Sequence, residues 1–182
     1  MTTEAYKPAG ILSFEEHSPS LAEGVFVAPG AQVIGQVTLG PDVNVWHNCV
    51  LRGDDMPITV GARTNIQDLS MLHVTTGMFG CHIGEDVTIG HRAIIHACTI
   101  GDRCLIGMGA IILDGAVIED DCMIAAGSII GPGKRIEAGS MIMGAPGRFK
   151  RKLTEQDVQM HLLSALHYVE LAKRHAASLG GS

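Results

Sequence analysis

Aromatic residues and positive charge are both scarce in this sequence. Phe, Tyr and Trp make up only 4% of the 182 residues although 46% are hydrophobic, so the core must be built from aliphatic side chains. The 13 Lys and Arg against 19 Asp and Glu give a net charge of −6. With no basic patch or arm, we expect neither nucleic acid nor a membrane as a partner. The low charged fraction, 18%, also argues against a disordered chain.

Long apolar runs and paired cysteines are missing as well. The sequence contains no run of about 18 apolar residues that would predict a membrane span. It also has no apolar segment near Met1 that resembles a signal peptide. The cysteines are odd in number and contain no CxxC pair: Cys49, Cys81, Cys98, Cys104 and Cys122. Reduced thiols in a cytoplasmic protein are the simplest interpretation.

An aliphatic residue recurs every six positions along most of the chain. The in-phase blocks are Leu21, Val27, Val33, Leu39, Val45 and Leu51; Val60, Ile66 and Leu72; Ile83, Ile89 and Ile95; and Ile100, Ile106, Ile112, Ile118, Ile124, Ile130, Ile136 and Ile142. Six residues form one short strand with its turn, so three such units close a coil of 18. The period therefore predicts an all-β solenoid, a parallel β-helix whose stacked coils bury the aliphatic column.

We expect this β-helix domain over residues 1–150 and a C-terminal α-helix with a tail over residues 151–182. Thr154 and Asp157 resemble a capping box. Apolar residues then recur at helical spacing to about residue 176: Val158, Leu162, Ala165, Leu166, Val169 and Ala172. Such an amphipathic helix is expected to pack on a flank of the β-helix.

Three irregularities interrupt the repeat. They are an insertion of three residues between Leu51 and Val60, an insertion of five between Leu72 and Ile83, and a deletion of one between Ile95 and Ile100. A solenoid carries loops only at its corners, and such loops often form binding surfaces. We therefore expect loops at the two insertions, and function beside them.

Histidines lie in register next to these breaks. Counting coils places Arg52, His73 and His96 above one another on the third face, so both imidazoles can reach one ion at about 2.0–2.1 Å. His91 lies on the second face, in a column with Asp68. A single outward histidine is more often solvated or in an interface, but the register favours a metal. A three-fold trimer would bring His91 of one subunit to the other two histidines, with a fourth position left for water, as in catalytic zinc sites.

Four motifs surround these histidines: Arg52-Gly53-Asp54, Asn65-Ile66-Gln67-Asp68, Leu72-His73, and Ile89-Gly90-His91-Arg92-Ala93-Ile94-Ile95-His96. They resemble the γ-class carbonic anhydrases and their relatives from carnitine and phenylacetate operons, and the resemblance covers essentially the whole chain. It implies a homotrimer of left-handed β-helices of hexapeptide repeats. It also implies one divalent ion at each interface, with His73, His91 and His96 as its ligands.

The same resemblance implies roles for neighbouring residues. Arg52 and Asp54 would form an intersubunit ion pair that supports the trimer, and Gln67 would hold the metal-bound solvent. Asn65 and Asp68 would belong to the polar network around the site.

The sequence departs from the best-characterised branch of that family in one segment. That branch carries a long acidic loop after the first histidine, with a glutamate thought to relay protons. Here residues 74–82 are short and contain no carboxylate, and Asp55 occupies the place of a second active-site glutamate with a shorter reach. Proton transfer would then fall to Asp55, to His82 or to buffer.

Reversible hydration of CO2 to bicarbonate by a metal-bound hydroxide is the leading prediction for function. Zinc is the default metal, and imidazole ligands also suit Fe2+ and Co2+. Two alternatives stay open: an acyl-CoA thioesterase or acyltransferase of the hexapeptide-repeat class, and a non-catalytic metal-binding trimer.

Overall fold

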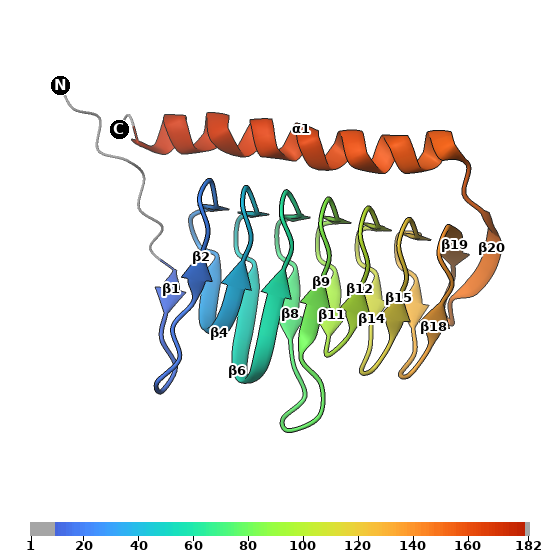
Figure 1. The fold of residues 1–182 in the computed structure, drawn as a ribbon, viewed down its shortest axis with the longest axis horizontal. Coiled ribbons are helices and arrows are strands. Elements are labelled where there is room, and N and C mark those ends of the chain that lie inside the picture. Colours follow the sequence, from blue (N-terminus) through green and yellow to red (C-terminus); the bar gives the residue numbers. More distant parts are fainter. Residues whose placement is uncertain (1–9, 181–182) are drawn as a thin grey trace.

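The protein is a left-handed parallel β-helix of about seven turns with one long α-helix along its side, as predicted (Figure 1). This computed structural model describes residues 10–180. Residues 1–9 and 181–182, which belong to the two predicted ranges 1–150 and 151–182, lie outside that description. Each coil pairs with the next in parallel register, so the short strands satisfy one another's backbone groups.

Residues 10–180 contain twenty strands and one helix. In chain order these are β1 (Ile11–Leu12), β2 (Ser20–Leu21), β3 (Phe26–Val27), β4 (Gln32–Leu39), β5 (Asn44–Val45), β6 (Val50–Val60), β7 (Asn65–Ile66), β8 (Met71–His73), β9 (Cys81–Ile83), β10 (Thr88–Ile89), β11 (Ile94–His96), β12 (Thr99–Ile100), β13 (Leu105–Ile106), β14 (Ile111–Ile112), β15 (Val117–Ile118), β16 (Met123–Ile124), β17 (Ile129–Ile130), β18 (Arg135–Ile136), β19 (Ser140–Met143), β20 (Arg148–Lys152) and α1 (Glu155–Gly180).

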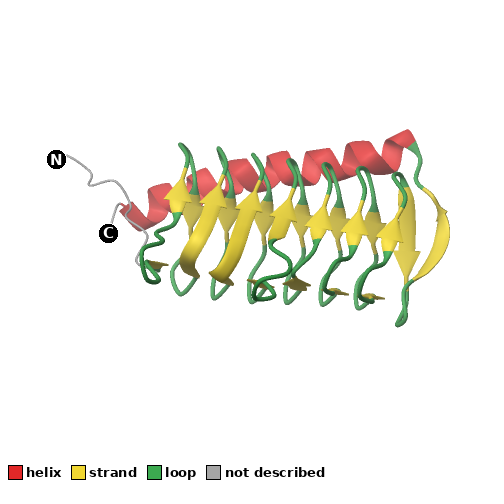
Figure 2. Ribbon diagram, turned by 60° about the horizontal axis from the view of Figure 1, so that its bottom comes forward, coloured by secondary structure: helices red, strands yellow, loops and turns green. Residues whose placement is uncertain are grey.

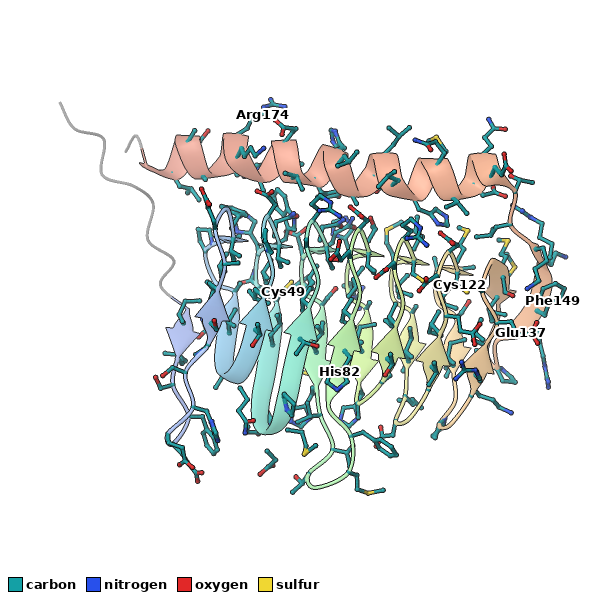
Figure 3. The ribbon with its side chains drawn as sticks, in the orientation of Figure 1. Cys49, His82, Cys122, Glu137, Phe149 and Arg174 are labelled. Atoms are coloured by element: carbon teal, nitrogen blue, oxygen red, sulfur yellow. The ribbon has the colours of Figure 1, made fainter. Side chains whose placement is uncertain are left out.

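The strands form three faces of a prism. Face 1 contains β9, β12, β15 and β18; face 2 contains β3, β5, β7, β10, β13, β16 and β19; face 3 contains β8, β11, β14 and β17. The aliphatic column points inward from all three faces, and its members are almost completely buried, from Leu39 through Ile66, Ile95 and Ile106 to Ile124. All five cysteines are buried as free thiols, and Figure 3 marks two of them, Cys49 and Cys122.

The three-residue insertion after Leu51 is not a loop, so that expectation is wrong. Strand β6 continues across the corner from face 3 to face 1, pairing with β8 at its start and with β9 at its end. Strand β4 runs beside it and pairs with residues 50–53 and 58–60, and the register shift between Gly35 and Val37 lies opposite residues 54–57. Gly35 has a φ of +73°, and a Cβ there would collide with the carbonyl oxygen of Gly53, so only glycine fits.

The five-residue insertion does form a loop. Thr75 and Phe79 pair as an antiparallel bridge around Gly77, whose φ is +64°, and this hairpin projects between β8 and β9 (Figure 1). Figure 3 shows His82 on β9, next to the base of the hairpin. The insertion therefore lies where face 3 turns into face 1.

Helix α1 lies along the coils and packs on face 2, where it contacts β3, β5, β7 and β10 (Figure 2). The predicted capping box is present, because Asp157 accepts hydrogen bonds from the backbone N–H and the hydroxyl of Thr154 while its own N–H donates to that hydroxyl. The helix ends four residues beyond the predicted end. Within residues 10–180, no helix has the length and apolar character needed to cross a bilayer.

Strand β20 was not predicted. It pairs antiparallel with β19 and covers the edge of the last coil on face 2, and the predicted boundary between residues 150 and 151 falls inside it. The labelled Phe149 lies on this strand at the end of the prism (Figure 3). An uncovered strand at the edge of a sheet can pair with another chain, and β20 covers this edge.

A histidine on the buried side of α1 predicts a pH dependence of stability. His161 is buried, and its Nδ1 lies 3.3 Å from the carbonyl oxygen of Arg103. Burial holds its pKa below the usual 6.5, against the opposing effects of that carbonyl and of Asp157 and Asp121. The unfolded chain then binds the proton more readily, so the free energy of unfolding should fall as the pH drops below about 6.5.

His161→Gln should lose this part of the pH dependence. Denaturant unfolding at pH 7.5 and 5.5 measures it, as the difference in unfolding free energy between the two pH values. His167→Gln, on the exposed side of the same helix, is the matched control and should keep the wild-type difference. Equal pH dependence in all three proteins would contradict the assignment.

Candidate metal centre

The predicted site residues gather at two corners that border face 3. The corner between faces 2 and 3 carries Asn65, Gln67, Asp68 and His91. The corner between faces 3 and 1 carries Arg52, Asp54, Asp55, His73 and His96. The predicted stacking is confirmed, because Arg52 pairs with His73 and His73 with His96 in strand register.

The two stacked histidines face one another. His73 Nδ1 lies 3.2 Å from His96 Nε2, and the ring centroids are 5.2 Å apart. A carboxylate lies behind each ring: His73 Nε2 is 3.2 Å from Asp54 Oδ1, and His96 Nδ1 is 2.7 Å from Asp114 Oδ1. Arg52 donates to the other oxygen of Asp54.

This arrangement suits a cation. When each carboxylate accepts the N–H of its histidine, the two remaining nitrogens of the neutral rings present lone pairs to each other across 3.2 Å. Two facing acceptors repel unless a proton or a metal ion lies between them. Two imidazole nitrogens on one tetrahedral zinc at about 2.0–2.1 Å would be roughly 3.3 Å apart, so the observed spacing fits.

The electrostatics of this corner favour the form of His73 that binds metal. Burial and the charge of Arg52 lower the pKa of His73, with Asp54 acting in the opposite direction. Burial opposes ionisation of Asp54, but its own backbone N–H, Arg52 and His73 together lower its pKa. His73 therefore stays neutral and Asp54 stays ionised near neutral pH, which is the state a metal ligand and its supporting carboxylate need.

The other corner holds the third histidine with its own carboxylate. His91 Nδ1 lies 2.9 Å from Asp68 Oδ2, and the His91 side chain is 42% exposed. Since Nδ1 is held by Asp68, Nε2 is the nitrogen left for a ligand. All three predicted histidines thus have one ring nitrogen paired with a carboxylate, a common arrangement behind metal ligands.

A chain of hydrogen bonds orients Gln67 at this corner. Gln67 Nε2 donates to Asn65 Oδ1 at 3.1 Å, Asn65 Nδ2 donates to Thr88 Oγ1 at 2.9 Å, and that hydroxyl donates to Ser164 Oγ on α1 at 3.2 Å. The Gln67 side chain is buried with its amide nitrogen engaged. Its carbonyl oxygen therefore remains as an oriented acceptor.

One chain does not bring the two corners together. Among residues 10–180, no three His, Cys, Asp or Glu side chains form a group that could hold a metal ion. His91 precedes strand β11 and His96 is its last residue, so these side chains leave the prism at opposite edges of face 3.

Face 3 differs from face 1 in what it presents outward. The outward column of face 3 begins with Gln32 and is apolar from there on: Val50, Met71, Ile94, Ile111 and Ile129. The matching column of face 1 is mostly polar: Thr38, Thr59, His82, Thr99, Val117 and Arg135. A hollow of about 440 Å³ next to His91 is lined by Ile94, Met108 and Ile111. An outward apolar column of this kind marks an interaction surface.

Two residues at the second corner escaped the sequence prediction. Asp114 contacts His96, and Thr75 Oγ1 donates to Asp114 at 2.6 Å. Asp114 follows Leu113, which stacks on His96 in the register that pairs Ile95 with Ile112, so extending the register count by one position would have placed it near His96. Thr75 lies in the inserted hairpin, where the repeat offers no register.

Comparisons with known proteins agree with the geometry. Residues 97–132 match the family described as "Bacterial transferase hexapeptide (six repeats)", and residues 81–112 match "Hexapeptide repeat of succinyl-transferase". "Carbonic anhydrase" of Geobacillus kaustophilus is 40% identical over 167 residues, which is 92% of this chain and 91% of that protein. The chain belongs to the γ-class carbonic anhydrase-like family.

Two further similar proteins extend the comparison. "Gamma carbonic anhydrase 2, mitochondrial" of Arabidopsis thaliana is 44% identical over 92% of this chain, and the chain spans 62% of that relative's length. A crystal structure of a hexapeptide transferase family protein from Anaplasma phagocytophilum matches 90% of this chain and 96% of its own, with a TM-score of 0.84 and 40% identity.

Proposed function

We propose that the protein catalyses the reversible hydration of CO2 to bicarbonate at a divalent metal held by His73, His91 and His96. The observation that carries this proposal is that two ring nitrogens, His73 Nδ1 and His96 Nε2, face each other at 3.2 Å while a carboxylate lies at the other nitrogen of each ring. A bound divalent ion makes a water molecule acidic enough to act as a nucleophile toward CO2 at neutral pH. Zinc is the first metal to test, with Fe2+ and Co2+ also suited to imidazole.

The chain's own residues would orient the reactants and move the proton. The free amide oxygen of Gln67 would accept a hydrogen bond from the attacking water, and Asn65 holds that amide in place. Asp68 holds His91 in the tautomer that a ligand needs. Each cycle releases one proton, and Asp55, which accepts a hydrogen bond from Thr76 Oγ1 at 2.7 Å, or His82 would relay it to buffer.

The proposal requires a homotrimer. The half-site with His91 and the half-site with His73 and His96 lie at opposite edges of face 3, so they complete each other only between copies of the chain. The apolar outward column of face 3 supports this, because it lies between the two half-sites and would be buried against the next subunit. A cytoplasmic location stays a prediction.

Arg52→Ala tests the proposed ion pair between subunits. Within one chain Arg52 already contacts Asp54, and the Arg52 side chain is 44% exposed, so it is able to reach an acidic group across an interface. If the pair supports the trimer, Arg52→Ala should shift the mass measured by light scattering at micromolar concentration from trimer toward monomer. An unchanged trimer mass would count against that role, and Lys173→Ala on the helix surface is the control.

Stopped-flow CO2 hydration tests the function itself. The protein should be loaded with zinc or, under anaerobic conditions, with Fe2+, and the buffer concentration varied in the same series. We expect activity that rises with buffer, because residues 74–82 supply no acidic relay. A fully metallated trimer without activity would overturn the proposal.

Acyl-thioester chemistry remains the alternative, since this fold is shared with a hexapeptide transferase family protein. Against it, three of the basic residues that could bind the phosphates of coenzyme A are paired within the chain: Arg135 with Glu119, Arg151 with Asp157, and Lys152 with Glu137 at 3.8 Å. Hydrolysis of an acyl-CoA by a protein inactive on CO2 would favour this alternative. A metallated trimer inactive in both assays would favour a binding role.

A further inference from the structure

The hairpin at residues 75–79 is anchored to the second corner. Thr75 Oγ1 donates to Asp114 Oδ2 at 2.6 Å. The Phe79 ring lies over Gly115, where an added Cβ would sit 3.4 Å from the ring. The inserted hairpin therefore rests on the turn that follows β14 and contacts Asp114 directly.

Asp114 receives one donor on each carboxylate oxygen. Thr75 donates to Oδ2, and His96 Nδ1 lies 2.7 Å from Oδ1. The Asp114 side chain is 37% exposed, so without a second partner it would be free to rotate into water. The Thr75 hydroxyl removes that freedom and holds Oδ1 toward the imidazole.

We propose that Asp114 is a positioning residue for His96, and that Thr75 holds Asp114 in the orientation this requires. The carboxylate accepts the Nδ1–H of His96, which fixes the tautomer whose Nε2 lone pair points to His73 Nδ1. The inference rests on the proposed metal centre. The short hairpin lacks an acidic group, and in this proposal it serves to orient the metal ligand His96 through Asp114.

Zinc affinity and the histidine tautomer together test this role. Asp114→Ala should bind zinc about 10- to 100-fold more weakly in competition with a chelator, the usual effect of removing a carboxylate behind a ligand. Thr75→Val should lose up to about 10-fold, and Thr75→Ser, which keeps the hydroxyl, should recover wild-type affinity. Thr99→Val, on the outward side of face 1, is the matched control.

The tautomer is read from the ¹⁵N shifts of the His96 ring in metal-free protein, with His96→Gln used to assign the signals. Wild type and Asp114→Asn, which keeps an acceptor oxygen, should show Nδ1–H, whereas Asp114→Ala should show mixed tautomers. An unchanged tautomer and unchanged affinity in a folded, trimeric Asp114→Ala would overturn the inference. The tautomer is measured without metal, so it tests the role of Asp114 independently of zinc binding. Failure of the wild-type protein to bind zinc would count against the proposed function, whereas an unchanged His96 tautomer in Asp114→Ala would count against the role of Asp114.

Discussion

His73→Ala is expected to bind zinc at least about 100-fold more weakly than the wild-type protein and to hydrate CO2 no faster than buffer does. His73 supplies one of the two ring nitrogens that face each other at the second corner, and its removal leaves His96 alone there. Loss of a direct ligand should exceed the 10- to 100-fold loss typical of an outer-shell partner. Chelator competition and stopped-flow hydration measure both effects.

His167→Ala is the control for this variant. His167 lies on the exposed side of α1, and its removal should leave metal content and activity unchanged. If His73→Ala kept both metal and full activity, the ligand assignment would be wrong.

Ile94→Lys is expected to convert the trimer to monomers and to abolish activity. Ile94 lies at the centre of the apolar outward column of face 3, and it is 40% exposed in the single chain. A charged side chain there would be buried without a partner in the interface, at several kcal/mol. Light scattering should show about 19.2 kDa in place of three times that mass.

Thr99→Lys is the matched control. Thr99 occupies the outward position of the same coil on face 1, where Arg135 fills the corresponding position two coils later. A lysine there should leave the trimer and its activity intact. A trimeric, active Ile94→Lys protein would show that face 3 is not the interface and that the site is assembled differently.

Much of the fold was predictable because the repeat is a strong local signal. An aliphatic residue every six positions leaves one arrangement that buries all of them, so the coils, their register and the stacking of Arg52, His73 and His96 follow from counting. The helix was equally readable, because Thr154 and Asp157 mark its start and apolar spacing marks its buried side.

The predictions failed where pairing between neighbouring strands, and not the local sequence pattern, decided the backbone conformation. The insertion after Leu51 looks like a loop by count, but β4 pairs with β6 on both sides of it, at residues 50–53 and 58–60, so β6 stays extended. Strand β20 carries charged residues and no alternation, and it pairs because the last coil presents an open edge.

The sequence by itself determined the β-helix, the helix along it, and the faces on which the three histidines lie, because all of these depend on residue spacing alone. Only the tertiary structure decided how the histidines are supported. Asp54, Asp68 and Asp114 come from different turns of the coil, and whether a carboxylate reaches an imidazole depends on side-chain geometry that no repeat records. For the same reason the contact between Thr75 and Asp114, which joins an irregular hairpin to a regular coil, became visible only in three dimensions.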